Sequence, residues 1–180
     1  MHSLAALLPA VQNNTLVRTL CAADLIRFHA YRSDSDLATY QGWSPMSLED
    51  ARVFIDEMAS VSALQPNAWV QLAIADSTSD ELLGDLGLYL EPDQSAGEVG
   101  FTLCRAAQGQ GHASRALRLS LSLLFAASSV PLVRAVTDTR NLGSVRVLER
   151  TGFTMSSVRQ TVFKAEPCTE VVYVYHRRDT

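Results

Sequence analysis

The sequence is poor in the residues that would point to a nucleic-acid or membrane protein. Lys and Arg together number 15 against 19 Asp and Glu, so the formal net charge of the 180 residues is -4, and no long basic block occurs. Nucleic acids and anionic membranes bind clustered cations, which are missing here. No window holds the roughly 18 apolar residues that a membrane span needs. We therefore expect neither a nucleic-acid partner nor a membrane association.

Cysteine is also scarce. Cys21, Cys104 and Cys168 are odd in number, lie far apart and form no CxxC pair. The pattern indicates neither a disulfide framework nor a zinc site, so we expect no metal. A reduced, cytoplasmic location is the simpler interpretation. The apolar run from Leu4 to Leu8 has no Lys or Arg before it, which disfavours a secretory signal.

The length and the 47% apolar share fit one globular domain. Alternating or apolar runs predict a strand at 15–21 and then an antiparallel meander of "AWVQLAIAD", "LLGDLGLYLEP" and "GEVGFTLC". Helical spacing predicts helices at 22–31, 47–60, 111–127 and 142–151, the third of them stopped by Pro131. The strand "LVRAVTD" and a final hairpin complete the order. We expect a single α/β (α+β) domain with a mixed, mostly antiparallel sheet flanked by helices.

The stretch "RAAQGQGHASRALRL" places Gly109 and Gly111 directly before the long helix. The first N–H groups of a helix are unpaired and carry partial positive charge. Glycines let such groups converge, and the result is a phosphate-binding site. The patterns GxxxxGK[ST] and GxGxxG are both absent, which argues against a nucleotide-binding domain of another family. The alternative is a simple turn that needs positive φ.

Two motifs resemble those of one family. Gln108 to Ala113 fit Q/R-x-x-G-x-G/A, the pyrophosphate-binding signature of the GNAT superfamily of acetyltransferases. Further on, "TRNLGSVRVLERTGF" resembles the second signature of that superfamily. Its matching residues are Asn141, Ser144, Leu148, Glu149, Gly152 and Phe153. The chain is most similar to the subgroup of ribosomal-protein-alanine and small-amine acetyltransferases, although Arg115 stands where that subgroup usually has Glu.

The resemblance implies one N-acetyltransferase domain over residues 1–180, with 15–177 as the fold proper and 1–14 as an N-terminal extension. It implies acetyl-CoA as co-substrate, a pantetheine arm paired along the central strand, and splaying of that strand from "LVRAVTD". The implied cofactor contacts are Phe101, Leu103, Arg105, Gln108, Gly109, Gln110, Gly111, His112, Ala113, Ser114, Asn141 and Ser144. The implied activity is direct acetyl transfer to a primary amine, either a protein N-terminus or a small amine.

This chemistry requires a neutral amine, a polarised carbonyl and a proton for the leaving thiolate. Glu98 is the candidate base, and strand alternation places it opposite Val99 and Phe101. The alternative is a surface Glu in a strand. Ser144 is the candidate acid, because no Tyr occurs between Tyr89 and Tyr173. It is equally suited to contact the CoA arm.

Three residues are candidates for contacts to the acceptor amine. Tyr40 and Trp43 lie in a loop that overhangs the acceptor site in this fold, or form a hydrophobic staple for the helix that begins at Ser47. Asp85 would hold an amine, or lies on a solvated strand face. A non-catalytic acyl-CoA-binding module for sensing or assembly is the second functional hypothesis. A homodimer, formed through edge strands near the C-terminal hairpin, also stays open.

Overall fold

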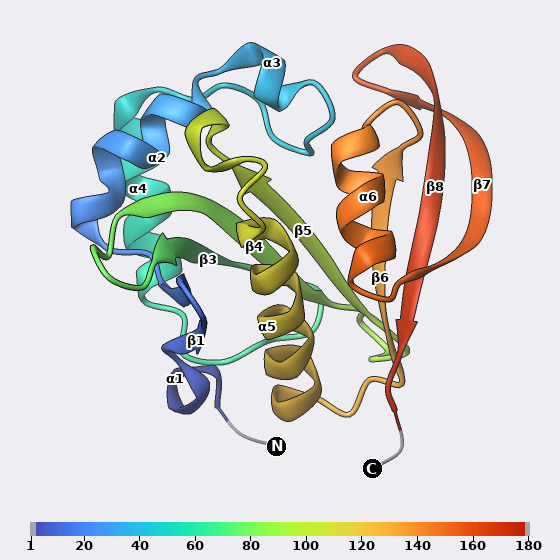
Figure 1. Ribbon diagram of the computed structural model, residues 1–180, viewed down its shortest axis with the longest axis horizontal. Helices are drawn as coiled ribbons and strands as arrows, with labels where there is room; N and C mark the ends of the chain where they lie inside the picture. Colours follow the sequence, from blue (N-terminus) through green and yellow to red (C-terminus); the bar gives the residue numbers. More distant parts are fainter. Residues whose placement is uncertain (1–2, 179–180) are drawn as a thin grey trace.

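The computed structural model describes residues 3–178 and contains one eight-stranded sheet with the order β1-β2-β3-β4-β5-β6-β8-β7 (Figure 1). The strands are β1 Ala10–Gln12, β2 Thr15–Thr19, β3 Trp69–Asp76, β4 Leu82–Leu90, β5 Gly97–Leu103, β6 Leu132–Asp138, β7 Thr154–Phe163 and β8 Glu166–His176. Neighbouring strands are antiparallel except for β5 and β6, which are parallel. The mixed, mostly antiparallel sheet is confirmed.

Helices cover both faces of the sheet (Figure 1). They are α1 Leu4–Leu7, α2 Leu25–Arg32, α3 Ser35–Ala38, α4 Leu48–Ala59, α5 His112–Ala127 and α6 Leu142–Arg150, with 3-10 turns at Ala22–Asp24 and Arg105–Ala107. Side chains alternate along β3. Leu72 and Ile74 therefore pack in the core that contains α5, whereas Ala73 packs in the core that contains α2 and α4.

Local signals begin and end the helices. The hydroxyl of Ser47 accepts from the amide of Asp50 at 3.1 Å, which confirms Ser47 as the N-cap of α4. Helix α5 ends at Ala127, the end that the sequence predicts, and Pro131 follows shortly after its C-cap. Ser128 adopts an extended conformation while its amide still bonds to Leu124, and this turns the chain out of the helix.

The segment before Thr15, expected to lie outside the fold proper, contributes to the sheet and to the core. Strand β1 pairs with β2 at the sheet edge, and Leu4 of α1 is fully buried in the larger core. A strand of three residues and a helix of four are too short to show a periodic pattern.

The two parallel strands diverge, as the family resemblance implied. β5 and β6 are in register only at Gly97–Val133 and Glu98–Arg134, although β5 continues to Leu103. Beyond this splay point the facing backbone groups of the two strands have lost their ladder partners. Glu98 thus occupies the last paired position. Over residues 3–178, none of the helices has the length and apolarity to cross a membrane.

Candidate active site

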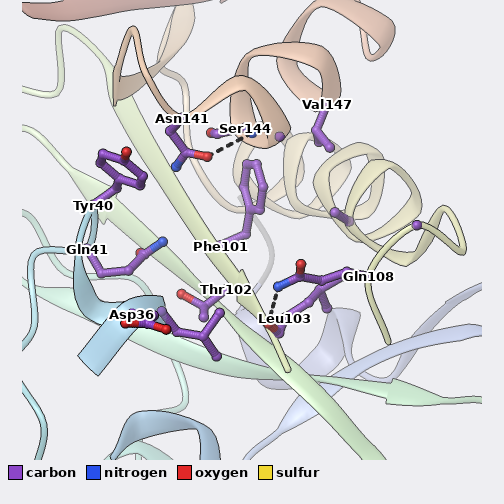
Figure 2. A pocket seen from close by; sticks show the side chains of 14 residues that line it. Asp36, Tyr40, Gln41, Phe101, Thr102, Leu103, Gln108, Asn141, Ser144 and Val147 are labelled. Atoms are coloured by element: carbon purple, nitrogen blue, oxygen red, sulfur yellow. Dashed lines mark hydrogen bonds between the residues drawn. The ribbon is translucent and has the colours of Figure 1, made fainter. Parts of the chain in front are cut away.

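A cavity of about 360 Å³ lies where the splayed strand β5 faces the first turns of α5 and α6. We call it the glycine-loop pocket (Figure 2). It is lined by Asp36, Leu37, Tyr40, Gln41, Phe101, Thr102, Leu103, Gln108, Gly109, Ala113, Asn141, Gly143, Ser144 and Val147. Figure 2 shows Phe101 reaching from β5 toward Ser144 on α6. Only Asp36 among the lining residues carries a charge, so binding here relies on backbone groups and neutral side chains.

The glycine loop presents unpaired donors. Gly109 and Gly111 have φ angles of +75° and +82°, which only glycine adopts without strain. Within the described part of the chain, the amides of residues 109–114 have no hydrogen-bond partner. The buried hydroxyl of Ser114, in the first turn of α5, also has none. Convergent N–H groups at a helix N-terminus suit a pyrophosphate, so these residues fit the CoA group that the motif implies.

Arg115, which stands where the subgroup usually has Glu, holds the glycine loop in place through side-chain hydrogen bonds. Its Nε donates to Thr15 Oγ1 at 2.7 Å and its Nη2 to the carbonyl of Gln110 at 2.8 Å. Thr15 Oγ1 also lies 2.9 Å from His112 Nδ1. Burial, and next the charge of Arg115, lower the pKa of His112, which favours the neutral imidazole.

The structure brings together part of the expected cofactor set. The residues that line the glycine-loop pocket are Phe101, Leu103, Gln108, Gly109, Ala113, Asn141 and Ser144. The expected residues that do not line it are Arg105, Gln110, Gly111, His112 and Ser114. The guanidinium of Arg105 is turned to Asp34 and Asp36 at 2.8 and 3.1 Å, because both carboxylates stand beside it at α3. The side chain of His112 is 3% exposed and directed at Thr15.

A second cavity, of about 280 Å³, lies beside the first. We call it the carboxylate pocket. It is lined by Tyr40, Gly42, Glu98, Val136, Thr137, Asp138, Arg159, Phe163, Cys168 and Glu170. Tyr40 lines both pockets, so the two cavities adjoin at its ring. Across the described residues, no group of three or more His, Cys, Asp or Glu side chains could hold a metal ion.

Glu98 enters the carboxylate pocket from the splay point. Partial burial raises the pKa of its carboxyl, and the nearby Glu91 and Glu170 raise it further, against Arg134 and Arg159. A carboxylate with a raised pKa is a better proton acceptor near neutral pH. The β4–β5 register runs without a shift, so the expected alternation of Glu98 with Val99 holds.

Ser144 occupies the third position of α6. Its amide donates to Asn141 Oδ1 at 3.2 Å, which makes Asn141 the N-cap, and its side chain lines the glycine-loop pocket (Figure 2). Tyr40 was expected only as an acceptor contact, whereas the structure puts this residue at both cavities.

Asp85 was expected to hold an amine or face solvent, and neither expectation is met. Its carboxylate is 1% exposed. It accepts hydrogen bonds from Tyr31 at 2.6 Å, from Arg32 at 3.0 and 2.9 Å, and from Gln71 at 2.6 Å. Asp85 is a β4 residue that is buried beneath α2, and Arg32 of α2 neutralises its charge. Asp85 is thus occupied and out of reach of an acceptor.

Trp43 does not line either pocket. Its ring lies against the buried Arg32 guanidinium, 4.5 Å from ring centroid to Cζ. Lys164, at the β7–β8 turn, donates to the carbonyls of Ala38 and Trp43, both at 2.7 Å. The segment that carries Tyr40 is held by these contacts. No sequence motif includes Lys164, so it was missed.

The comparisons with known proteins agree with this geometry. The family model described as "Acetyltransferase (GNAT) domain" matches residues 14–154, and the chain belongs to this family. By family it is an acetyl-CoA-dependent N-acetyltransferase. No curated protein matches the chain.

Several solved structures share the fold at low identity. A GNAT-family acetyltransferase from Bacillus anthracis is 20% identical, with a TM-score of 0.81 over 93% of this chain and 97% of the other. The Salmonella typhimurium enzyme that modifies the N-terminal serine of ribosomal protein L7/L12 is 17% identical, with a TM-score of 0.77 over 94% and 98%. Spermidine N-acetyltransferase from Vibrio cholerae, in complex with CoA and spermine, is 16% identical, with a TM-score of 0.75 over 91% and 95%.

Proposed function

We propose that this enzyme transfers an acetyl group from acetyl-CoA directly to a primary amine. In this proposal the glycine-loop pocket holds acetyl-CoA and the carboxylate pocket holds the amine. One observation supports it most. Strand β5 contributes Glu98 to the carboxylate pocket and Phe101 to Leu103 to the glycine-loop pocket, so the two cavities adjoin along one strand.

The residues that would hold acetyl-CoA are those of the glycine loop and the splayed strand. The free amides of residues 109–114 would bind its pyrophosphate, and the unpaired backbone of β5 would bind its amide-containing arm. When bound, acetyl-CoA supplies an acetyl group activated as a thioester. The Arg115 contacts keep the loop in its donor-presenting shape.

The reaction replaces a C–S bond by a C–N bond, and the amine loses a proton. The chain must therefore offer a proton acceptor beside the amine and a proton donor on the thiol side. Glu98 accepts the proton in this proposal, since its pKa is raised and it lines the carboxylate pocket. The Ser144 hydroxyl donates on the other side.

The proposal extends to chain organisation and location. We treat residues 1–180 as one catalytic domain, since α1 and β1 join the same core and sheet as the rest. Cytoplasmic location is proposed on the three free cysteines, of which Cys21 is exposed.

A thermal melt tests the cofactor assignment. Acetyl-CoA, CoA and ATP are compared at about 1 mM. A ligand at ~100 times its Kd stabilises by ~2.7 kcal/mol, which is roughly 5–10 °C for a domain of this size. We expect both CoA species to raise the midpoint and ATP to leave it unchanged. If neither CoA species shifts the melting midpoint, the proposal loses its basis.

Two substitutions separate an enzyme from a binding module. Glu98→Gln and Ser144→Ala should each lower kcat by about 10²-fold or more, the typical contribution of general acid–base catalysis. The CoA-induced shift should persist in both. Tyr40→Phe tests the hydroxyl of the residue that lines both pockets. Full turnover in Glu98→Gln and Ser144→Ala would refute their assignment.

A further inference from the structure

The face of the sheet that carries Glu98 is covered along only part of its length. Residues directly opposite in neighbouring antiparallel strands share a face. Three such rows cross β3, β4 and β5, namely Ala73–Asp85–Thr102, Gln71–Gly87–Gly100 and Trp69–Tyr89–Glu98. The first row is buried beneath α2, whereas Trp69 in the last row is 46% exposed. The uncovered part of this face therefore lies beside the candidate base.

Trp69 extends over the middle row because Gly87 has no side chain. A Cβ built on Gly87 would lie 2.9 Å from Cε3 and Cζ3 of the indole. The indole also stacks on Tyr89, with ring centroids 5.2 Å apart and an interplanar angle of 30°. Tyr89 in turn donates to Asn67 Oδ1 at 3.0 Å. These contacts hold the indole in one position while much of it remains exposed.

Gly100, which is opposite Gly87, leaves an open space beside the indole. Among residues 3–178, no heavy atom outside the neighbours of Gly100 in the chain lies within 4 Å of a Cβ built on it. Its φ angle is outside the left-handed region, so the backbone conformation does not require glycine here. Neither packing nor the backbone accounts for this glycine, whereas a ligand that crosses the strand would use the space.

The space over Gly100 connects the indole to Glu98. Glu98 and Gly100 lie two positions apart on one face of β5, and Gly87 is the diagonal neighbour of Glu98. Diagonal neighbours in a sheet are about 7–8 Å apart. Gly100 also lies beyond the splay point, where β5 no longer pairs with β6. An amine at Glu98 therefore has room for a substituent over Gly100, and the indole forms the far wall.

The indole suits an apolar substituent. An aromatic ring offers a flat apolar surface, on which another ring stacks or a branched hydrocarbon packs. The diagonal separation corresponds to a spacer of roughly two carbon atoms between the nitrogen and the apolar group. The row that contains Gly87 and Gly100 has no charged residue. A second ammonium group in place of the apolar group would thus lose its hydration without gaining an ion pair in this row.

We infer that Trp69 is a specificity-determining residue for the acceptor, and that it selects primary amines with an apolar group on a short carbon chain. The nitrogen lies at Glu98, the carbon chain crosses Gly100, and the apolar group packs against the indole. This inference rests on the proposed function and adds Trp69 and Gly100 to its acceptor site.

A series of amines tests the inference on the full chain at saturating acetyl-CoA, with thiol release as the signal. Phenethylamine and isopentylamine carry the apolar group, ethylamine lacks it, and diaminobutane has a second charge instead. We expect kcat/KM for the first two to exceed that for the others by about tenfold or more. Equal or higher values for ethylamine or diaminobutane would overturn the inference.

Substitutions of Trp69 test the role of the indole. Trp69→Ala should remove the preference for phenethylamine, whereas Trp69→Phe should keep most of it, because a ring remains. Ile26→Ala is the control, since Ile26 on α2 is 69% exposed and lines neither pocket. A preference that survives in Trp69→Ala would contradict the assigned role.

Gly100→Ala tests the path between the two groups. The new methyl group would occupy the space of the carbon chain, so KM for phenethylamine should rise about tenfold. The melting midpoint and the CoA affinity should match those of wild type, because the methyl group meets no atom of the protein. A wild-type KM in this variant would exclude the path across Gly100.

Indole emission gives a readout that does not depend on turnover. Trp43 and Trp69 are the two tryptophans of the chain. With CoA bound, phenethylamine should change the emission of wild type and leave that of Trp69→Phe unchanged. If CoA does not shift the melt, the proposed function fails. If CoA shifts the melt but phenethylamine neither changes the emission nor reacts faster than ethylamine, only this inference fails.

Discussion

The two pockets are built in different ways, although they share Tyr40 and one strand. The glycine-loop pocket uses backbone amides and neutral side chains, most of them from two short motifs. The carboxylate pocket uses charged side chains from β5, β6, β7 and β8, which meet only when the sheet forms. A site that must bind the same cofactor throughout a family can be encoded locally. A site that selects an acceptor depends on distant residues. Substitutions should therefore affect one pocket and spare the other.

The largest effect is expected at the buried ion pair of Arg32 and Asp85, which belongs to neither pocket. Asp85→Asn leaves the buried Arg32 guanidinium without its carboxylate, and breaking a buried pair typically costs ~3–5 kcal/mol. At ~2–4 °C per kcal/mol, the midpoint should fall by roughly 6–20 °C in a thermal melt. Asp34→Asn, which breaks an exposed pair with Arg105, is the control and should melt nearly as wild type does. Equal melts for the two variants would exclude a structural role for the buried pair.

The next effect concerns the glycine-loop pocket. Gly109→Ala and Gly111→Ala both force a non-glycine residue to positive φ, at ~1–2 kcal/mol each. Only at Gly111 would the new Cβ meet another group, Nη1 of Arg115 at 2.8 Å, and so displace its contacts with the loop. We expect Gly111→Ala to weaken CoA binding about tenfold more than Gly109→Ala, measured by calorimetric titration. KM for the amine should stay constant. Identical losses in the two variants would show that Arg115 does not fix the loop.

A smaller effect is expected in the pH dependence of Glu98. Its raised folded pKa means that folding favours the protonated carboxyl, so its contribution to stability is present at low pH and is lost as pH rises through that pKa. Glu98→Gln should therefore melt above wild type at neutral pH and equal to it in acid. In wild type, kcat/KM should fall on the acid side with an apparent pKa above the ordinary value of 4.5. This fall should be absent in the variant.

Glu57→Gln, an exposed helix position, is the control for this comparison. A wild-type acid limb at or below the ordinary value, or a Glu98→Gln variant that is no more stable at neutral pH, would contradict the assigned environment of Glu98.

The smallest effect is expected at Lys164, the one lysine of the chain. Lys164→Met removes the two hydrogen bonds that hold the segment carrying Tyr40. We expect KM for the amine to rise about threefold with little change in kcat, since only positioning is lost. CoA affinity should not change. Arg146→Met, an exposed substitution on α6, is the control. A loss of CoA affinity in Lys164→Met would remove the distinction between the pockets.

Sequence patterns located most elements of the fold. The predicted helix at 47–60 is observed at Leu48–Ala59, since its cap and its apolar spacing agree. The end of α5 at Ala127 was also predicted, and the chain turns out of the helix at Ser128, before Pro131 is reached. Asp85 was misjudged. Alternation shows which face a residue occupies, yet not that α2 buries this part of the sheet and supplies Arg32.

The sequence by itself determined the fold class, the family and the glycine loop, because periodicity, capping residues and the φ angles that glycine permits act between residues close in the chain. Only the tertiary structure decided which charges share the carboxylate pocket. Glu98, Asp138, Arg159 and Glu170 come from four strands, and their pairing depends on sheet register. Electrostatic interactions act over distances in space, which the order of residues along the chain does not record.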